Sequence, residues 1–205
     1  MLTVITPAMS SALTTLEAVK ADLGLSGGGD DAYLGALIDR ASDTITAWCG
    51  RTFARETVRE TFRPSCPLAA LSLERLPVVA LTSVTVGGDA AELDRVEVEG
   101  GTGILHRLDA TGYRLPWRAE VTVVTYAAGY ILPGAVGRDL PADIEAACLA
   151  LVRLAYHRRG ADPLLKAATL GETKLDFYSA PLGAEDGIPA EVGGMLERHR
   201  AVWVG

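Results

Sequence analysis

The sequence predicts an α+β fold: a three-helix core, an antiparallel β insertion between helices two and three, and an extended C-terminal tail with a short helix. Three observations predict it. Apolar residues recur at helical spacing in three segments, the last of which is 139–160. The region before that segment changes to alternating and β-branched runs separated by glycine turns. Residues 161–205 have mixed polarity and no sustained period. The expected parts are a helical hairpin of the core (1–54), a β insertion (55–135), a core-closing helix (136–160) and a partner-docking tail (161–205).

Composition limits the classes of function. With 49% hydrophobic residues among 205, the chain can bury a sizeable core, which excludes disorder of the whole chain. A formal net charge of −7 argues against general affinity for nucleic-acid backbones. The same acidity would suit a channel through which DNA slides without sticking. No basic leader precedes an apolar core, and no apolar run approaches the roughly 20 residues of a membrane helix, so we expect a soluble protein with no membrane partner.

The first two helices have recognisable ends, after a stretch over residues 1–12 that reads as a loose lead-in. The candidate caps and stops are Thr14 or Thr15 with Gly24 for the first helix, and Asp30 or Asp31 with Gly50 for the second. The glycine run at 26–31 between them lacks the Gly-Lys-Ser/Thr and the preceding strand of a phosphate-binding loop, so we interpret it as a flexible connection. The short link favours an antiparallel hairpin that needs a third helix to cover it.

Short strands are expected between the second and third helices. The runs that read as strands are 55–63, 79–86, 95–99, 104–108 and 120–126, with a further run from Leu71 that Pro77 interrupts. The charged alternation of 55–63 predicts an exposed strand. Glycine turns without intervening helical patterns predict antiparallel meanders.

The third helix begins near Pro141, and Gly160 is its expected stop. Its last turn carries His157, Arg158 and Arg159. Two interpretations stay open for these three residues. They complement the helix dipole in water, or they contact an acidic partner surface or passing DNA.

The sequence contains few residues in patterns typical of disulfides, metal sites or catalytic sites. Cys49, Cys66 and Cys148 are too few and too scattered for a disulfide framework or a zinc site, and the first and last fall on apolar helical patterns. No metal-ligand spacing, calcium loop or nucleophile motif is present, so we assign no metal, no cofactor and no catalytic residue. An active site assembled from distant residues is the alternative that sequence cannot exclude.

Apolar residues are scattered through the tail. Those that could anchor it on a partner are Leu164, Leu165, Leu170, Leu175, Phe177, Tyr178 and Trp203. The segment 174–178 could form a short strand or add to a partner's sheet. Pro189 begins a last short helix with a weak apolar stripe. We expect this tail to take its fold only against another subunit.

Four groups of residues carry a family resemblance. They are Leu73-x-Arg75-x-Pro77-Val78 with Leu81-x-Ser83-Val84-x-Val86; Val123-x-x-Tyr126-x-Ala128-Gly129-Tyr130; Leu140-Pro141-x-Asp143-Ile144 with Tyr156; and Ile188-Pro189 through Leu196, His199 and Arg200. Together with the order of elements over residues 13–200, they resemble the head–tail connector adaptor proteins of long-tailed bacteriophages and gene transfer agents. The Gly193-Gly194 pair departs from the pattern, because glycines weaken a helix.

The resemblance implies a structural protein without turnover, located in the neck of a virion or gene-transfer-agent particle that assembles in the bacterial cytoplasm. It implies a ring, expected to be a dodecamer, below the portal protein of a DNA-filled capsid. The tail would dock on the portal, and the opposite face would receive the stopper or tail-completion protein. Double-stranded DNA would pass through the lumen without sequence-specific binding. The alternatives are a small enzyme, or a regulatory binding module, with a site between sheet and helices.

Overall fold

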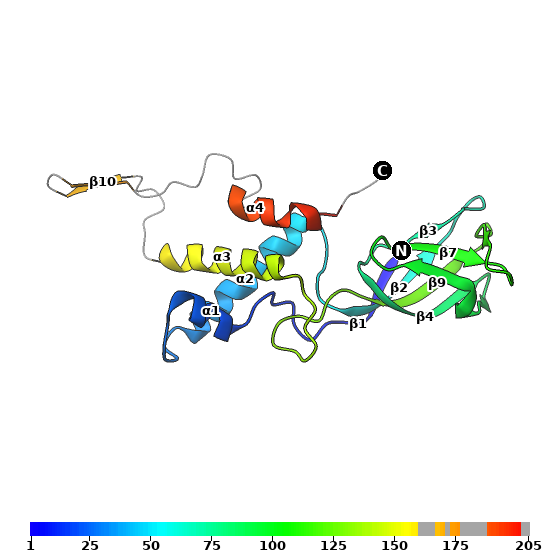
Figure 1. Ribbon diagram of the computed structural model, residues 1–205, viewed down its shortest axis with the longest axis horizontal. Helices are drawn as coiled ribbons and strands as arrows, with labels where there is room; N and C mark the ends of the chain where they lie inside the picture. The colour runs from blue at the N-terminus through cyan, green and yellow to red at the C-terminus, as the bar shows by residue number, and fades with distance from the viewer. Residues whose placement is uncertain (160–166, 171–172, 177–187, 202–205) are drawn as a thin grey trace. The chain divides into compact units, whose positions relative to one another are not determined.

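The computed structural model describes residues 1–159, 167–170, 173–176 and 188–201. Over these residues the chain is mixed α and β, with four α-helices and antiparallel sheets (Figure 1). It divides into two compact units, each made of two stretches of sequence. The β unit comprises Met1–Ser10 and Thr52–Asp139, and the helical unit comprises Ser11–Arg51 and Leu140–Gly205.

The helical unit contains α1 (Leu16–Leu23), α2 (Asp31–Cys49), α3 (Ala142–His157) and α4 (Ala190–Leu196), the last followed by a 3-10 turn (Glu197–His199). The local signals act as expected at three helix ends. Thr15 Oγ1 accepts from the amide of Ala18 at 3.1 Å, and Gly24 and Gly50 end α1 and α2 in the left-handed conformation. Pro141 immediately precedes α3, and the expected stop at Gly160 lies outside the described residues.

The core of this unit forms around α3, which contacts α1, α2 and α4. Its fully buried side chains include Val19, Leu34, Ile45, Ile144, Cys148 and Leu196. A polar pair is enclosed with them, since the amide of Leu13 donates to Ser42 Oγ at 3.0 Å. Figure 1 shows α4 lying along α3. The four helices therefore bury their apolar stripes on one another.

The C-terminal helix is part of this core. Ile188, Val192 and Leu196 are buried, and the amide of Ala201 donates to the carbonyl of Cys49 at the end of α2 at 2.7 Å. The expectation that everything after residue 160 takes its fold from a partner is therefore wrong for residues 188–201. Burial against helices that are distant in sequence stabilises a segment whose own glycines make it a poor helix.

The β unit is built on a five-stranded antiparallel sheet in the order β1-β2-β9-β4-β5. Its strands are β1 (Leu2–Thr6), β2 (Glu56–Phe62), β9 (Thr122–Ala128), β4 (Val78–Val86) and β5 (Asp89–Ala90). The expectation of a loose lead-in over residues 1–12 is thus wrong at its start, because Leu2–Thr6 pair with β2 at the edge of the sheet.

A smaller antiparallel sheet completes the unit. It consists of β3 (Leu71–Ser72), β7 (Ile104–Leu108), β6 (Val96–Glu99) and β8 (Arg114–Leu115), with a 3-10 turn at Leu93–Arg95. The largest buried side chain is Trp117, whose indole N–H donates to the carbonyl of Leu105 at 3.0 Å. It packs with Val58, Val124 and Tyr126 from the larger sheet. One core thus joins both sheets.

Strand β2 is not the exposed strand that its charges predict. It lies between β1 and β9, and Val58 and Glu60 on one of its faces are buried. Glu60 Oε2 accepts from Tyr126 Oη at 2.8 Å and from the amide of Glu74 at 3.1 Å. Because these hydrogen bonds satisfy the Glu60 carboxylate, a strand with alternating charged residues can bury one face in the core. Burial nevertheless raises the pKa of Glu60 above its ordinary value, because these two hydrogen bonds only partly offset the lost hydration.

Two short strands, β10 (Ala167–Leu170) and β11 (Thr173–Asp176), form an antiparallel pair of their own. Leu170 pairs with Thr173, and Ala168 with Leu175. A two-stranded pair alone is marginally stable in water. Among the helices of the described ranges, none is long and apolar enough to cross a bilayer.

Candidate functional site: surfaces of the helical unit

Some residues at the basic end of α3 make contacts within the chain, with the loop before α2. Arg159 Nη1 donates to Asp30 Oδ1 at 2.6 Å, and the Arg159 guanidinium carbon lies 4.4 Å from the ring centroid of Tyr33. Tyr156 Oη donates to the other carboxylate oxygen of Asp30 at 3.1 Å. The hydrogen bond from Arg159, followed by that from Tyr156, holds the pKa of Asp30 below its ordinary value. The end of α3 is thereby tied to the loop before α2.

The contact with Asp30 distinguishes Arg159 from the other two basic residues, His157 and Arg158. All three side chains are exposed, but within the described part of the chain only Arg159 bonds to a carboxylate, that of Asp30. Asp30 was expected as a candidate cap of α2. It occupies the cap position but makes no side-chain capping bond there. Sequence could not show the Asp30–Arg159 pair, because 129 residues separate its members.

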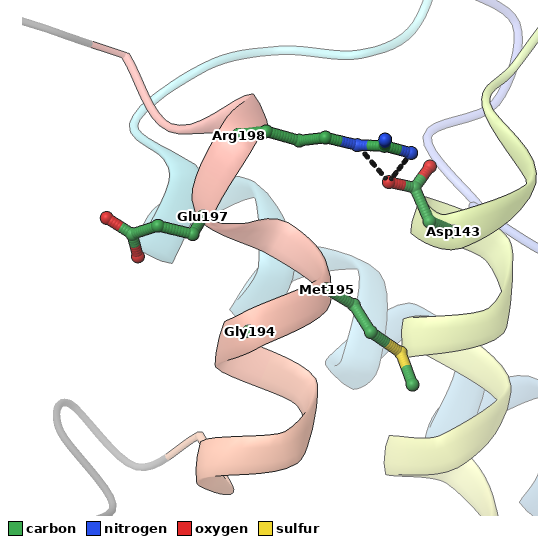
Figure 2. A pocket seen from close by; sticks show the side chains of 5 residues that line it. All are labelled: Asp143, Gly194, Met195, Glu197 and Arg198. Atoms are coloured by element: carbon green, nitrogen blue, oxygen red, sulfur yellow. Dashed lines mark hydrogen bonds and ion pairs between the residues drawn. The ribbon is translucent and has the colours of Figure 1, made fainter.

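A second ionic cluster joins the start of α3 to the turn after α4 (Figure 2). Asp143 Oδ2 lies 2.6 Å from His199 Nε2 and accepts from Arg198 Nε at 2.7 Å. Burial raises the pKa of Asp143, but the hydrogen bonds from His199 and Arg198 outweigh it, so that the pKa lies below the ordinary value. This Asp143 cluster stabilises the C-terminal helix on α3.

An open pocket lies beside that cluster, lined by Asp143, Gly194, Met195, Glu197 and Arg198. In Figure 2 the Met195 side chain extends toward α3 and the Arg198 guanidinium reaches Asp143. After the turn that follows α4 the chain returns to α2, where the Arg200 guanidinium carbon lies 4.9 Å from the Trp48 ring centroid. Two of the three charged residues of the pocket, Asp143 and Arg198, thus bond to each other and attach the turn after α4 to α3.

Most of the expected docking residues lie outside the described part of the chain. These are Leu164, Leu165, Phe177, Tyr178 and Trp203. Leu170 and Leu175 belong to the paired strands β10 and β11. Their role in docking stays a prediction.

The residues considered for chemistry are dispersed. Cys49 and Cys148 are buried in the helical unit, and burial raises the pKa of each thiol to about 11. Cys66 is exposed in the β unit. In the ranges that the structure describes, no group of three or more His, Cys, Asp or Glu side chains is arranged to hold a metal ion.

Comparison with known proteins identifies relatives over nearly the whole chain. A family model described as "Head completion protein" matches residues 12–202. The fold is similar to a chain in the structure "Neck of empty GTA particle computed with C6 symmetry", with a TM-score of 0.58 at 17% identity. It is also similar to chains in "Neck of native GTA particle computed with C12 symmetry" (0.57, 18%) and "Virion of native gene transfer agent (GTA) particle" (0.56, 20%).

Each of these three matches covers 100% of this chain and 97% of the other. At this level of identity they establish a shared fold. No curated protein matches the chain.

Proposed function

This chain belongs to the head completion protein family, and on that premise we propose that it is a structural head–tail adaptor. In this proposal twelve copies form a ring below the portal of a DNA-filled capsid. The ring connects the capsid to the stopper or tail-completion protein, and double-stranded DNA passes through its lumen without sequence-specific contacts. The role is structural and involves no turnover.

The observation that carries the proposal is the family match over residues 12–202, which spans both units. The similarity in fold to chains in gene-transfer-agent necks supports it, since those structures were computed with sixfold and twelvefold symmetry. Identical subunits related by a cyclic axis repeat one heterologous contact around a closed ring. Many weak contacts then add up to a stable assembly.

Portal docking is assigned to the stretch between the helical core and its C-terminal helix. Residues 188–201 are anchored on α2 and α3, so we restrict the docking tail to residues 161–187, with Trp203 as an additional anchor. Apolar side chains on such a segment can supply the buried anchors of an interface. Because both ends of the segment connect to the same helical unit, its docking would fix that unit on the portal.

The first experiment deletes the chain from a host that makes the particles. We expect filled heads without attached tails, counted by electron microscopy, and restoration by the full chain supplied in trans. Normal numbers of tailed particles after deletion would contradict the adaptor role.

The second experiment tests the docking tail without removing α4. A variant with Leu164, Leu165, Phe177 and Tyr178 replaced by serine should keep the helical content and melting temperature of the wild type but fail to bind portal-bearing heads. The matched control replaces Met9 and Val136, exposed apolar residues of the β unit (105% and 100% exposed), by serine. If the tail variant still joins heads to tails as well as the control does, the docking assignment is wrong.

A further inference from the structure

The outward face of α2 carries two carboxylates. Asp39 and Asp43 are exposed, and each lies two positions after a buried residue, Leu37 and Ala41, which places it about 200° further around the helix. Neither carboxylate bonds to a cation within the described ranges of the chain. Arg40 shares this face, but its Nε donates to the carbonyl of Ala36 at 3.2 Å. That bond does not neutralise the guanidinium, so the face is net acidic because two carboxylates outnumber one cation.

The outward face of α3 has the opposite charge. Arg153 and His157 lie four positions apart, and each follows a buried residue, Ile144 or Cys148, by nine positions, about half a turn from the core. Arg158 is exposed in the turn directly after the helix, beside this face rather than on it. Arg153 reaches Asp22 at 3.4 Å through an exposed contact, whereas no carboxylate in the described part of the chain bonds to His157 or Arg158. Such an exposed pair contributes little and leaves Arg153 available to a partner.

These two faces cannot meet within one chain. Helices α2 and α3 pack on each other through their buried residues, so their exposed faces point away from each other. One side of the helix pair therefore presents carboxylates and the other presents cations. Two complementary patches on opposite sides of a unit are what a head-to-tail contact between identical subunits requires.

We propose that Asp39 and Asp43 of one copy bind the basic patch of the next copy, formed by Arg153, His157 and Arg158. The proposal deepens the adaptor function and rests on it, because it names the contact that closes the ring.

Charge complementarity favours a second copy over other occupants. DNA or an acidic portal surface would satisfy the cations of α3 but would leave Asp39 and Asp43 without a counterpart. The chain as a whole has a formal charge of −7, so copies repel one another except where a basic patch is brought against an acidic face. The two patches thus specify both the partner and its orientation.

The experiment is a charge swap in the full chain, scored by the number of heads joined to tails. Arg158→Glu alone and Asp43→Lys alone should each lower that number by about tenfold or more, because like charges then face each other at every contact in the ring. The double variant should return to within about twofold of the wild type, since the swapped pair attracts again. Arg118→Glu and Asp94→Lys, at exposed positions of the β unit, are matched controls that should join normally.

Two results would overturn the contact: single variants that join normally, or a double variant in which Asp43→Lys fails to rescue the loss caused by Arg158→Glu. The last result would assign the basic patch to the portal or to DNA. Circular dichroism checks that each variant folds. If a variant does not fold, the charge swap is repeated with Arg153→Glu and Asp39→Lys. Deletion of the chain distinguishes a failure of the proposed adaptor function from a failure of the proposed ring contact. If deletion does not block joining, the adaptor function fails; if only the swap fails, the ring contact fails.

Discussion

Tyr126 Oη donates a 2.8 Å hydrogen bond to Glu60 Oε2 in the interior of the β unit. Tyr126 is fully buried and Glu60 is 5% exposed. The same tyrosine oxygen accepts from the amide of Arg75 at 3.1 Å, and the same carboxylate accepts from the amide of Glu74. Two neighbouring strands, β2 and β9, thus hold the loop that joins β3 to β4.

Removing the Tyr126 hydroxyl should destabilise the β unit. In Tyr126→Phe the amide of Arg75 loses its acceptor and Glu60 loses one donor, and a buried group left unpaired costs about 1–3 kcal/mol. Urea unfolding measures the change. Tyr113→Phe, at a tyrosine that is 75% exposed, should have no measurable effect. Equal stabilities of the two variants would show that the interior network contributes nothing.

Glu60 should make the free energy of unfolding depend on pH with a sign opposite to that of a carboxyl whose pKa is lowered on folding. Burial raises its pKa above the ordinary value of 4.5, so the folded chain binds this proton more readily than the unfolded chain. Stability from this group therefore falls as pH rises through the interval just above 4.5. The free energy of unfolding of the wild type, minus that of Glu60→Gln, should increase as pH is lowered from 7 through that interval. A difference that does not vary with pH would contradict the assignment.

Gly129 should tolerate a side chain less well than Gly88, although both have φ near +99°. A Cβ on Gly129 would lie 2.4 Å from the carbonyl oxygen of Ala54, whereas a Cβ on Gly88 would meet no atom within 4 Å. Gly88→Ala should cost about 1–3 kcal/mol from backbone strain alone. Gly129→Ala should cost clearly more, and thermal unfolding of the two variants measures the difference. Equal costs would mean that the contact relaxes without penalty.

The Asp143 cluster should control the attachment of α4. In Asp143→Asn, hydrogen exchange of the α4 amides at pH 7 should accelerate by about tenfold, which corresponds to one charge-assisted hydrogen bond. Because the pKa of Asp143 lies below its ordinary 3.8, this stabilisation is present above that value and is lost as pH falls through the folded pKa. Asp94→Asn is the control. Unchanged exchange in Asp143→Asn would assign the attachment to Ile188, Val192 and Leu196 alone.

Local signals explain what the sequence predicts well. The caps and stops at Thr15, Gly24 and Gly50 act within one helical turn, and apolar spacing alone assigns Cys49 and Cys148 to the core. The order of the strands in the sheet is not local. Leu2–Thr6 form a strand only because β2, more than 50 residues later, provides the pairing edge.

The same limit applies to the charged residues. The alternation in β2 cannot show that Glu60 bonds to Tyr126, and the run at 157–159 cannot show that Arg159, and not Arg158, bonds to Asp30. Gly193 and Gly194 argue against a helix, yet α4 forms, because its Val192 and Leu196 are buried where it packs on α3. Side-chain contacts between remote segments decided each of these outcomes.

A reconstruction of the particle neck at side-chain resolution tests the adaptor role most directly. We expect twelve copies of this chain in one ring against the portal, with residues 161–187 contacting portal subunits and Arg158 of each copy facing Asp43 of its neighbour. Density for the chain elsewhere in the particle, or residues 161–187 packed only on their own subunit, would contradict it.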